Sequence, residues 1–581
     1  MRSGRQAGVV FAAALVGAVA LSGSGGGEAA ASPSYFPTLA RATYRSISAM
    51  VEPSTGLPQD RFDRSMYDIF PQLALVQAVP VAGPGPGASL EATRCTAPEC
   101  RSSGRYGLKL TYDTPSGTFA SYPVNSSGFD VTKAKYLELW VKGAAGGERF
   151  EVVLWSNCQG GFPGRPDVGL VTATAAWRRV RIPLAAYEPY ADLSSLCRLA
   201  IGFNDAISPS GTVYLDRVAF VDAYGQRIRL AVDETTSTTN IGLYMADLAA
   251  ATDLGLESRG SATTKLRKTV TSVEAFQKWH GFPETWNHVV SRTPVEEGDG
   301  RCLSAVDEAN LAAGLVVVRQ RFPALADRAT ALLDAMDWSW LVDPSLGLLY
   351  VCRYPDGSTK PQHYDFLAAD SRIAYVVGIG SGKLPPSLWG NLNRATEAPR
   401  CASEAHFTPG WSGGGLFMQF LPGIFVPEAG TVLGDSAEHF VDDQICFATQ
   451  IGAPAWGWSA TSLPPFGADY CGYNCERDDV LVPHASILAV DDVPLASLEQ
   501  NLEALQTIGA RPPVTDGTRT FDFGFAASVN WQTNEVNTSY LVLDQSMAFL
   551  SLANHLNGKT RQAFAADPIG AAAISLIPDY Q

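Results

Sequence analysis

The hydrophobic pattern of this chain changes its period near residue 235, and that change constrains the fold more than any other feature. From about 100 to 230, short segments alternate apolar and polar residues, as in "KYLELWVKG" and "TVYLDRVAFVD". They are rich in β-branched and aromatic residues, and Gly, Pro, Ser or Asn separates them. Because no helical pattern lies between them, residues 96–232 are predicted to form an antiparallel β-sandwich.

After about residue 235 the pattern becomes helical. Apolar residues recur at three- and four-residue spacing, and Gly- and Pro-rich joints separate the segments. The expected helices are 240–255, 303–320, 323–338, 364–380, 411–425, 434–451, 495–508, 540–556 and 560–577. Such a series of helical hairpins predicts an all-α toroid for residues 233–581, in which an inner ring of helices surrounds a cleft.

Composition narrows the class of partner. A chain of 581 residues is too long for one core, so two or three domains are expected. With 46% hydrophobic and 17% charged residues, the chain is typical of a well-packed globular protein. A net charge of −15 without a basic stripe argues against nucleic acid as a partner. A polysaccharide or oligosaccharide suits this surface better.

The N-terminus has the pattern of an export signal. Arg2 and Arg5 precede the apolar run "AGVVFAAALVGAVALSG", and "EAAAS" offers small residues for cleavage after Ala31. Residues 1–31 are therefore predicted to be a signal peptide, with a membrane anchor as the alternative, although the run is short for one. No later segment is apolar enough to span a membrane, so the mature protein is expected to be secreted or periplasmic and not membrane-bound.

The stretch between the signal and the sandwich has no strong periodicity. "VAGPGPGAS" at 81–89 is rich in Pro and Gly, as hinges and loops are. Residues 32–95 are therefore predicted to be an N-terminal extension that ends in a linker.

Ten cysteines agree with export. Four lie in the first part of the chain and six in the second, namely Cys95, Cys100, Cys158 and Cys197, then Cys302, Cys352, Cys401, Cys446, Cys471 and Cys475. Even counts in both parts favour disulfides within each part, although the sequence does not settle which cysteines pair. "CTAPEC" and "CGYNC" are spaced more widely than the usual zinc pair and lack a His-rich partner, so neither a metal nor another cofactor is expected.

One helical segment, "HYDFLAADSRIAYVVGIG" at 363–380, carries a carboxylate on its apolar stripe. On a 3.6-residue helix, Asp370 shares a face with His363 and Ile373, whereas Arg372 points the opposite way. An unpaired charge at such a position is costly. Asp370 is therefore either a functional acid or the N-cap of a helix that starts at Ser371.

Two further helical segments repeat this pattern. Asp307 shares its face with Leu303 and Leu311, and Asp544 shares its face with Tyr540 and Met547. Three carboxylates on three apolar stripes indicate a common polar pocket. The alternative is that each acid has an independent structural role.

Aromatic and polar side chains accompany these helices. Tryptophan faces stack on sugar rings, and carboxylates hold the sugar hydroxyls. The predicted substrate-binding residues are Trp286, Trp411, Trp456, Trp458 and Trp531, together with Glu308, Glu535, His363 and Arg372. For any single tryptophan, packing between helices is the alternative.

Two carboxylates at a cleft are what glycoside hydrolysis requires, since one gives a proton to the leaving oxygen and the other activates water or attacks the anomeric carbon. A desolvated carboxyl has a raised pKa, as a general acid needs near neutrality. Asp370 is the predicted acid, Asp307 the second carboxylate or a substrate ligand, and Asp544 a third candidate. No P-loop or H-E-x-x-H motif supports another chemistry.

Ordered motifs give the helical part a family resemblance. "GFPETWNHVVSRTP", "LSAVDEANLAAGL", "HYDFLAADSRIAYVVGIGSGKLP", "GWSGGGLFMQFLPGIF" and "YLVLDQSMAFLSLANHL" follow one another in this sequence. The segment from "TNIGLYMADLAAATDLG" to the C-terminus thereby resembles the glycoamylase-like domain of bacterial endo-β-1,2-glucanases, which also occurs in cyclic β-1,2-glucan synthases. The resemblance implies an (α/α)6 barrel that hydrolyses a β-glucan with inversion. "WRRVRIPL" and "TVYLDRVAF" make the first part similar to the jelly-roll modules of secreted carbohydrate-active enzymes, which implies either glycan binding or a structural role.

The resemblance also assigns residues. Asp307 matches the Asp at the start of the family's "VD" helix, and Asp544 matches its "DQG" segment, with Ser546 in place of Gly. Asp370 stands where the family usually has Glu in "SE-x-R", and Met418 stands at the Glu of its "WGGSMFE" stretch. The leading hypothesis is therefore a glycoside hydrolase of the endo-β-glucanase type, acting on a β-glucan such as β-1,2-glucan. The two departures motivate a second hypothesis, a catalytically silent glycan-binding protein, and a polysaccharide lyase is a third.

Overall fold

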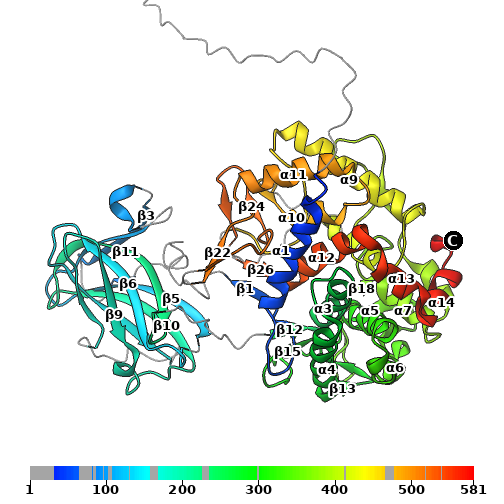
Figure 1. Ribbon diagram of the computed structural model, residues 1–581, viewed down its shortest axis with the longest axis horizontal. Coiled ribbons are helices and arrows are strands. Elements are labelled where there is room, and N and C mark those ends of the chain that lie inside the picture. Colours follow the sequence, from blue (N-terminus) through cyan, green and yellow to red (C-terminus); the bar gives the residue numbers. More distant parts are fainter. Residues whose placement is uncertain are drawn as a thin grey trace, which may run out of the picture.

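The structure is a computed structural model. It describes residues 32–63, 81–82, 87–95, 97–102, 107–129, 131–156, 168–225, 235–296, 300–410, 414–464, 477–516, 519–537 and 539–581. The predicted signal peptide, the remainder of the Pro/Gly-rich stretch, Cys158, Trp411, Cys471 and Cys475 lie outside the described residues. The strands and the helices form two separate domains (Figure 1), and each domain has its own large hydrophobic core.

The first domain is a sandwich of two five-stranded antiparallel sheets. One sheet has the order β2 (Val81–Ala82), β5 (Phe119–Phe129), β10 (Leu196–Asn204), β7 (Arg149–Trp155), β8 (Leu170–Thr172). The other has the order β3 (Ser89–Cys95), β4 (Gly107–Asp113), β11 (Ser210–Val221), β6 (Tyr136–Gly143), β9 (Arg178–Pro183). Along β6 the residues alternate between buried and half-buried, so Leu137, Leu139 and Val141 face the core. The period-two pattern thus predicted a β-sandwich correctly.

The second domain is helical and has two layers. Six helices follow one another around the inside, namely α3 (Thr238–Asp253), α5 (Ala305–Arg321), α7 (Arg372–Gly380), α8 (Leu416–Phe420), α10 (Pro483–Leu488) and α12 (Val542–Asn557). Each packs against the next, α7 reaches α8 through Arg372, and α12 returns to α3. Each also packs against one outer helix, in the same order α4 (Arg259–Ala275), α6 (Ala326–Ala335), α14 (Pro568–Leu576), α9 (Val432–Ile451), α11 (Leu495–Thr507) and α1 (Tyr35–Ala49). Another helix, α13 (Lys559–Ala566), packs on α5 and α14.

The N-terminal segment corrects the prediction for residues 32–95. Helix α1 buries Leu39 and Ile47 in the helical core and lies along α12 (Figure 1), and β1 (Arg61–Asp63) pairs with β26 (Ser539–Leu541). Residues 32–63 therefore belong to the helical domain, whereas β2 and β3 belong to the sandwich. In sequence, the sandwich is an insertion into the helical domain, and the Asp60 amide donates to the Thr235 carbonyl across the insertion point (2.8 Å).

Several predicted helices differ from the structure at their ends. The segment 364–380 becomes helical only at Arg372, because His363 and Tyr364 form β18 in a sheet with β17 (Leu348–Tyr350). Pro568 divides the predicted helix 560–577 into α13 and α14, and Asp567 caps the second by accepting from the Ile569 amide. The structure also contains α1, α4 and α10, which were not predicted.

Among the described residues, three disulfides join cysteines that lie 5, 50 and 45 residues apart in sequence. Cys95–Cys100 closes a loop of the sandwich, and Cys302–Cys352 and Cys401–Cys446 lie in the helical domain. These pairs confirm the expectation of disulfides within each part. No helix among the described residues has both the length and the apolarity that crossing a bilayer requires.

The closest helix pair, α3 and α5, meets through glycine. A methyl group on Gly314 would lie 2.2 Å from the Gly242 carbonyl oxygen, which is closer than any real contact. The two backbones therefore touch directly, and this contact holds the first turns of α3 against the middle of α5.

We predict that Gly314→Ala lowers the free energy of unfolding by roughly 1–3 kcal/mol, because the added methyl group forces these helices apart. Gly260→Ala is the control, since Gly260 lies in a helix with open space around it. The control is expected to be neutral or stabilising by up to about 1 kcal/mol. Equal effects of the two substitutions in chemical denaturation would contradict the close contact.

Candidate active site

The predicted acids lie where inner helices begin. Asp307 is the third residue of α5, Asp544 is the third residue of α12, and Asp370 precedes the first residue of α7 by two positions. The partial positive charge of a helix N-terminus stabilises carboxylates in its first turn. The inner helices thus carry these acids to one end of the helical domain.

Asp307 and its neighbour Glu308 point in different directions. Asp307 is half-buried and accepts a hydrogen bond from the Thr239 hydroxyl of α3 (2.7 Å), and burial raises its pKa. Glu308 is fully buried and accepts from the Thr238 hydroxyl (3.1 Å). Burial, followed by the charge of Asp307, raises the pKa of Glu308 well above its ordinary value. Asp307 is therefore the accessible acid of α5, and the structure does not offer Glu308 to a substrate.

Asp370 lies beside Asp307 but not on a helix face, which corrects the helical-face interpretation. It is half-buried, and its carbonyl accepts from the Ile373 amide in the first turn of α7. Burial and the charge of Asp307 raise the pKa of Asp370 to about 7, against the opposing effects of the Ser371 amide and Arg372. A carboxyl group of this kind holds its proton near neutrality and can donate it.

Tyr364 completes this cluster. Its hydroxyl lies 2.9 Å from the hydroxyl of Ser304, the residue that precedes α5. Burial and the charges of Asp307 and Asp370 raise the pKa of Tyr364 well above its usual value. The phenol therefore stays neutral next to the two acids. Sequence analysis missed Tyr364, although it stands next to His363 in the motif that drew attention to Asp370.

A second group of polar residues surrounds the start of α12. Asp544 is buried, accepts from the Thr461 hydroxyl (2.7 Å) and lies 3.4 Å from Nδ1 of the buried His484. Asp60 from the N-terminal segment is close enough for the charge of Asp544 to raise its pKa, and it accepts from the Asn240 side chain (3.0 Å). Asn240 and Thr239 are neighbours in α3, so this helix connects the two groups of acids.

Arg372 is not a substrate ligand in this structure. Its guanidinium is fully buried, donates to both carboxylate oxygens of Glu428 (3.0 and 2.6 Å), and also donates to the carbonyls of Ala369, Met418 and Gln419. The arginine joins α7 to α8 and fixes the backbone next to Asp370. On the predicted helix, Arg372 points away from Asp370. In the structure that direction leads into the core, so the Arg372 side chain stabilises the packing of the helices.

The predicted aromatic residues are dispersed. Trp456 and Trp458 lie in the helical core, where Trp458 packs against Phe447, so both are structural. Trp286 is half-buried in β15 (Trp286–His288), and the half-buried Trp531 donates to the Asp478 carbonyl (2.8 Å).

The remaining predicted ligands are half-buried. His363 lies 3.0 Å from a carboxylate oxygen of Asp343, on the strand that also holds Tyr364. Glu535 lies in the short strand β25 (Glu535–Val536), which pairs with β24 (Val529–Asn530). The roles of His363 and Glu535 as substrate ligands stay predictions.

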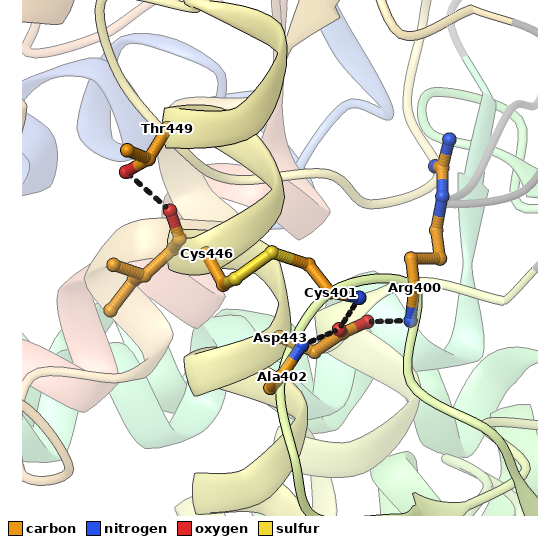
Figure 2. The surroundings of a disulfide bond; sticks show 7 residues. Arg400, Cys401, Ala402, Asp443, Cys446 and Thr449 are labelled. Carbon is orange, nitrogen blue, oxygen red and sulfur yellow. Dashed lines mark hydrogen bonds between the residues drawn. A yellow bond between two sulfur atoms is a disulfide. The ribbon is translucent and has the colours of Figure 1, made fainter.

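The loop at residues 393–402 is anchored at both of its ends. The Asn393 carbonyl accepts from the Leu367 amide, which ties the loop to the segment that precedes Asp370. Residues 400–402 of the loop are held by two contacts with α9 (Figure 2). The Cys401–Cys446 disulfide is one, and the Asp443 carboxylate, which accepts hydrogen bonds from the amides of Arg400, Cys401 and Ala402, is the other. The loop is thus anchored to α9 on one side and to the acid-bearing segment on the other.

The acids do not make a metal site. Among residues the structure describes, no three His, Cys, Asp or Glu side chains gather in a way that could hold a metal ion. The cluster is better suited to proton transfer, because its carboxyl groups have raised pKa values and accept hydrogen bonds from neutral hydroxyl and amide groups.

Comparisons with known proteins agree with this architecture. Residues 95–222 match the family model of carbohydrate binding domain 30. The cyclic β-(1,2)-glucan synthase NdvB of Rhizobium meliloti (strain 1021) is 29% identical over 307 residues, which are 48% of this chain and 10% of that protein. These findings support the glycoamylase-like family predicted from the sequence. The chain spans only about a tenth of the synthase, so the activity of the whole synthase is not transferred.

Solved structures share the fold of this chain. A β-1,2-glucanase from Parabacteroides distasonis has a TM-score of 0.61 at 13% identity, covering 90% of this chain and 99% of that chain. An endo-β-1,2-glucanase from Chitinophaga pinensis, solved with sophorotriose and glucose, has a TM-score of 0.53 at 17% identity, covering 59% of this chain and 87% of that chain. At these identities the likeness establishes the fold.

We predict that Asp370→Asn stabilises the protein at pH 8 and that this gain in Tm shrinks as the pH falls. The folded-state pKa of about 7 exceeds the ordinary value of 3.8, so ionised Asp370 costs stability above both values and costs nothing below 3.8. Asp356→Asn is the control, because Asp356 is exposed and bonds to Ser358. A gain that does not change between pH 5 and pH 8 would show that the pKa of Asp370 is not raised.

Proposed function

We propose that the chain is a secreted glycoside hydrolase that cleaves a β-glucan-type polysaccharide, with β-1,2-glucan as the expected substrate. One observation carries the proposal: Asp370, a half-buried carboxyl with a pKa of about 7, lies beside Asp307 where inner helices begin. The fold shared with solved β-1,2-glucanases supports the choice of glucan. Disulfides persist in oxidising compartments, which supports export.

The proposed architecture is an (α/α)6 toroid preceded by a jelly-roll module. The cycle of inner helices, each backed by one outer helix, supports the toroid. The match to carbohydrate binding domain 30 supports a glycan-binding role for the sandwich. In this proposal the cleft lies inside the ring at the ends where Asp307 and Asp370 stand, and the sandwich holds the same polysaccharide.

In the proposed mechanism, Asp370 is the general acid. It gives its proton to the glycosidic oxygen as the bond to the anomeric carbon breaks. Asp307 keeps Asp370 protonated near neutrality through its negative charge, and it is placed to bind hydroxyls of the sugar. We propose inversion as the stereochemical outcome.

One observation favours a second candidate, a silent glycan-binding protein. Met418 is the third residue of α8, the position that Asp307 occupies in α5 and Asp544 in α12. It is buried next to Gly410, and a methyl group on that glycine would lie 3.2 Å from the Met418 sulfur. A thioether cannot exchange protons. The third residue of α8 therefore cannot act as an acid or a base, unlike the Asp residues at the same position of α5 and α12.

We predict that the wild type releases reducing ends from linear β-1,2-glucan and that Asp370→Asn lowers kcat by about 10²–10⁴-fold, the usual contribution of a general acid. Asp356→Asn, a loss of the same charge on an exposed loop, is expected to keep full activity. A panel of other glucans tests the linkage in the same assay.

Affinity electrophoresis separates the two candidate functions. Retardation of the wild type in a glucan gel without release of reducing ends supports the silent binder and contradicts the hydrolase. Full activity of Asp370→Asn contradicts the assignment of the acid.

A further inference from the structure

Asp60 reaches the acids from a distant part of the chain. Its amide donates to Thr235 just before α3, and its carbonyl accepts from the Val542 amide at the first position of α12 (2.9 Å). Both backbone bonds hold Asp60 between the starts of these two inner helices. The sandwich separates Asp60 from α3 in sequence, so only the fold brings this carboxylate to the site.

Exposure distinguishes Asp60 from Asp544. The Asp60 side chain is 26% exposed, whereas the Asp544 side chain is 3% exposed. Water or a substrate can therefore touch Asp60 but not Asp544. The Asn240 amide holds the Asp60 carboxylate through one oxygen, Oδ1.

Asp544 acts on Asp60 through its charge. The Thr461 hydroxyl fixes it, and His484 lies 3.4 Å away with neither ring nitrogen in a hydrogen bond among the described residues. A buried imidazole without hydrogen bonds, beside a buried carboxylate, is a costly arrangement that calls for a functional explanation. Burial first, and the charge of Asp544 in addition, raise the pKa of Asp60 against the opposing effects of Arg61, 3.9 Å from its Oδ2, and of the Asn240 amide.

The position of Asp60 also matches the geometry of inversion. An inverting hydrolase needs its acid and its base on opposite faces of the sugar ring, with room for a water molecule. Asp307 and Asp370 stand together on α5 and before α7, and Asp60 stands on the other side of α3. Asp60 is thus separated from the acid by α3, whereas the charge of Asp307 acts on the acid directly.

On the basis of the proposed function, we infer that Asp60, and not Asp544, is the general base. The water oxygen attacks the anomeric carbon, and Asp60 takes the proton that this water loses. The bond from the anomeric carbon to the glycosidic oxygen breaks, its electron pair goes to that oxygen, and the oxygen takes the proton of Asp370. Exchange with solvent then returns a proton to Asp370 and removes one from Asp60.

The test measures hydrolysis of linear β-1,2-glucan by the full-length protein. Asp60→Asn is expected to lower kcat by about 10²–10⁴-fold while KM and Tm change little. Glu52→Gln is the matched control, because Glu52 lies in the same segment and its side chain bonds only to Ser54 among the described contacts. This control is expected to keep full activity.

Chemical rescue separates a base from a structural residue. Asp60→Ala leaves space for azide, which is expected to restore part of the rate and to give a glycosyl azide of inverted configuration. A structural defect would not respond to azide. If the wild type and Asp60→Asn are both active, the inference about Asp60 is wrong and the proposed function is unaffected. The same conclusion follows if the wild type is active, Asp60→Ala is inactive and azide does not rescue it. A wild type that cleaves no glucan overturns the proposed function and this inference with it.

Discussion

The site depends on the ion pair between the buried guanidinium of Arg372 and the carboxylate of Glu428. Breaking a buried ion pair by removing one partner typically costs about 3–5 kcal/mol, because the other charge is left unpaired. Arg372 has its charge matched by Glu428 and its remaining donors matched by backbone carbonyls of the segment before α7 and of α8. Tyr580 at the C-terminus donates to the same Glu428 (3.1 Å). One cation therefore joins α7, α8 and the end of the chain, and Asp370 stands two residues before it.

The N-termini of the helices explain how several carboxylates are tolerated in the helical domain. Asp307 and Asp544 each lie in the first turn of a helix, where the backbone offers partial positive charge, and each accepts a hydroxyl hydrogen bond from a neighbouring element. These interactions lessen the cost of desolvation without removing it, as the raised pKa values of Asp307 and Asp370 show. Sites that exchange protons at neutral pH need such groups, so the cost in stability accompanies the proposed chemistry.

Sequence periodicity predicted the local features well and the distant ones poorly. Asp307 and Asp544 were found because a polar residue interrupts an apolar stripe that is visible within one helix. Asp60 was missed because its partner Asn240 lies 180 residues away, beyond an inserted domain. Arg372, Trp456 and Trp458 were assigned to the substrate because residue type does not reveal burial. The helix boundary before Arg372 was misplaced because Tyr364 pairs with Leu349 in a sheet, a tertiary contact that helical propensity does not report.

The most direct test of the account is a crystal structure of Asp370→Asn with a linear β-1,2-gluco-oligosaccharide. We expect one glycosidic oxygen within about 3 Å of the side chain at position 370, the distance that proton transfer requires. We also expect the carboxylates of Asp307 and Asp60 to lie on different sides of the adjoining sugar ring. An oligosaccharide bound only to the β-sandwich, or one in the helical domain that does not approach position 370, would contradict the central claim.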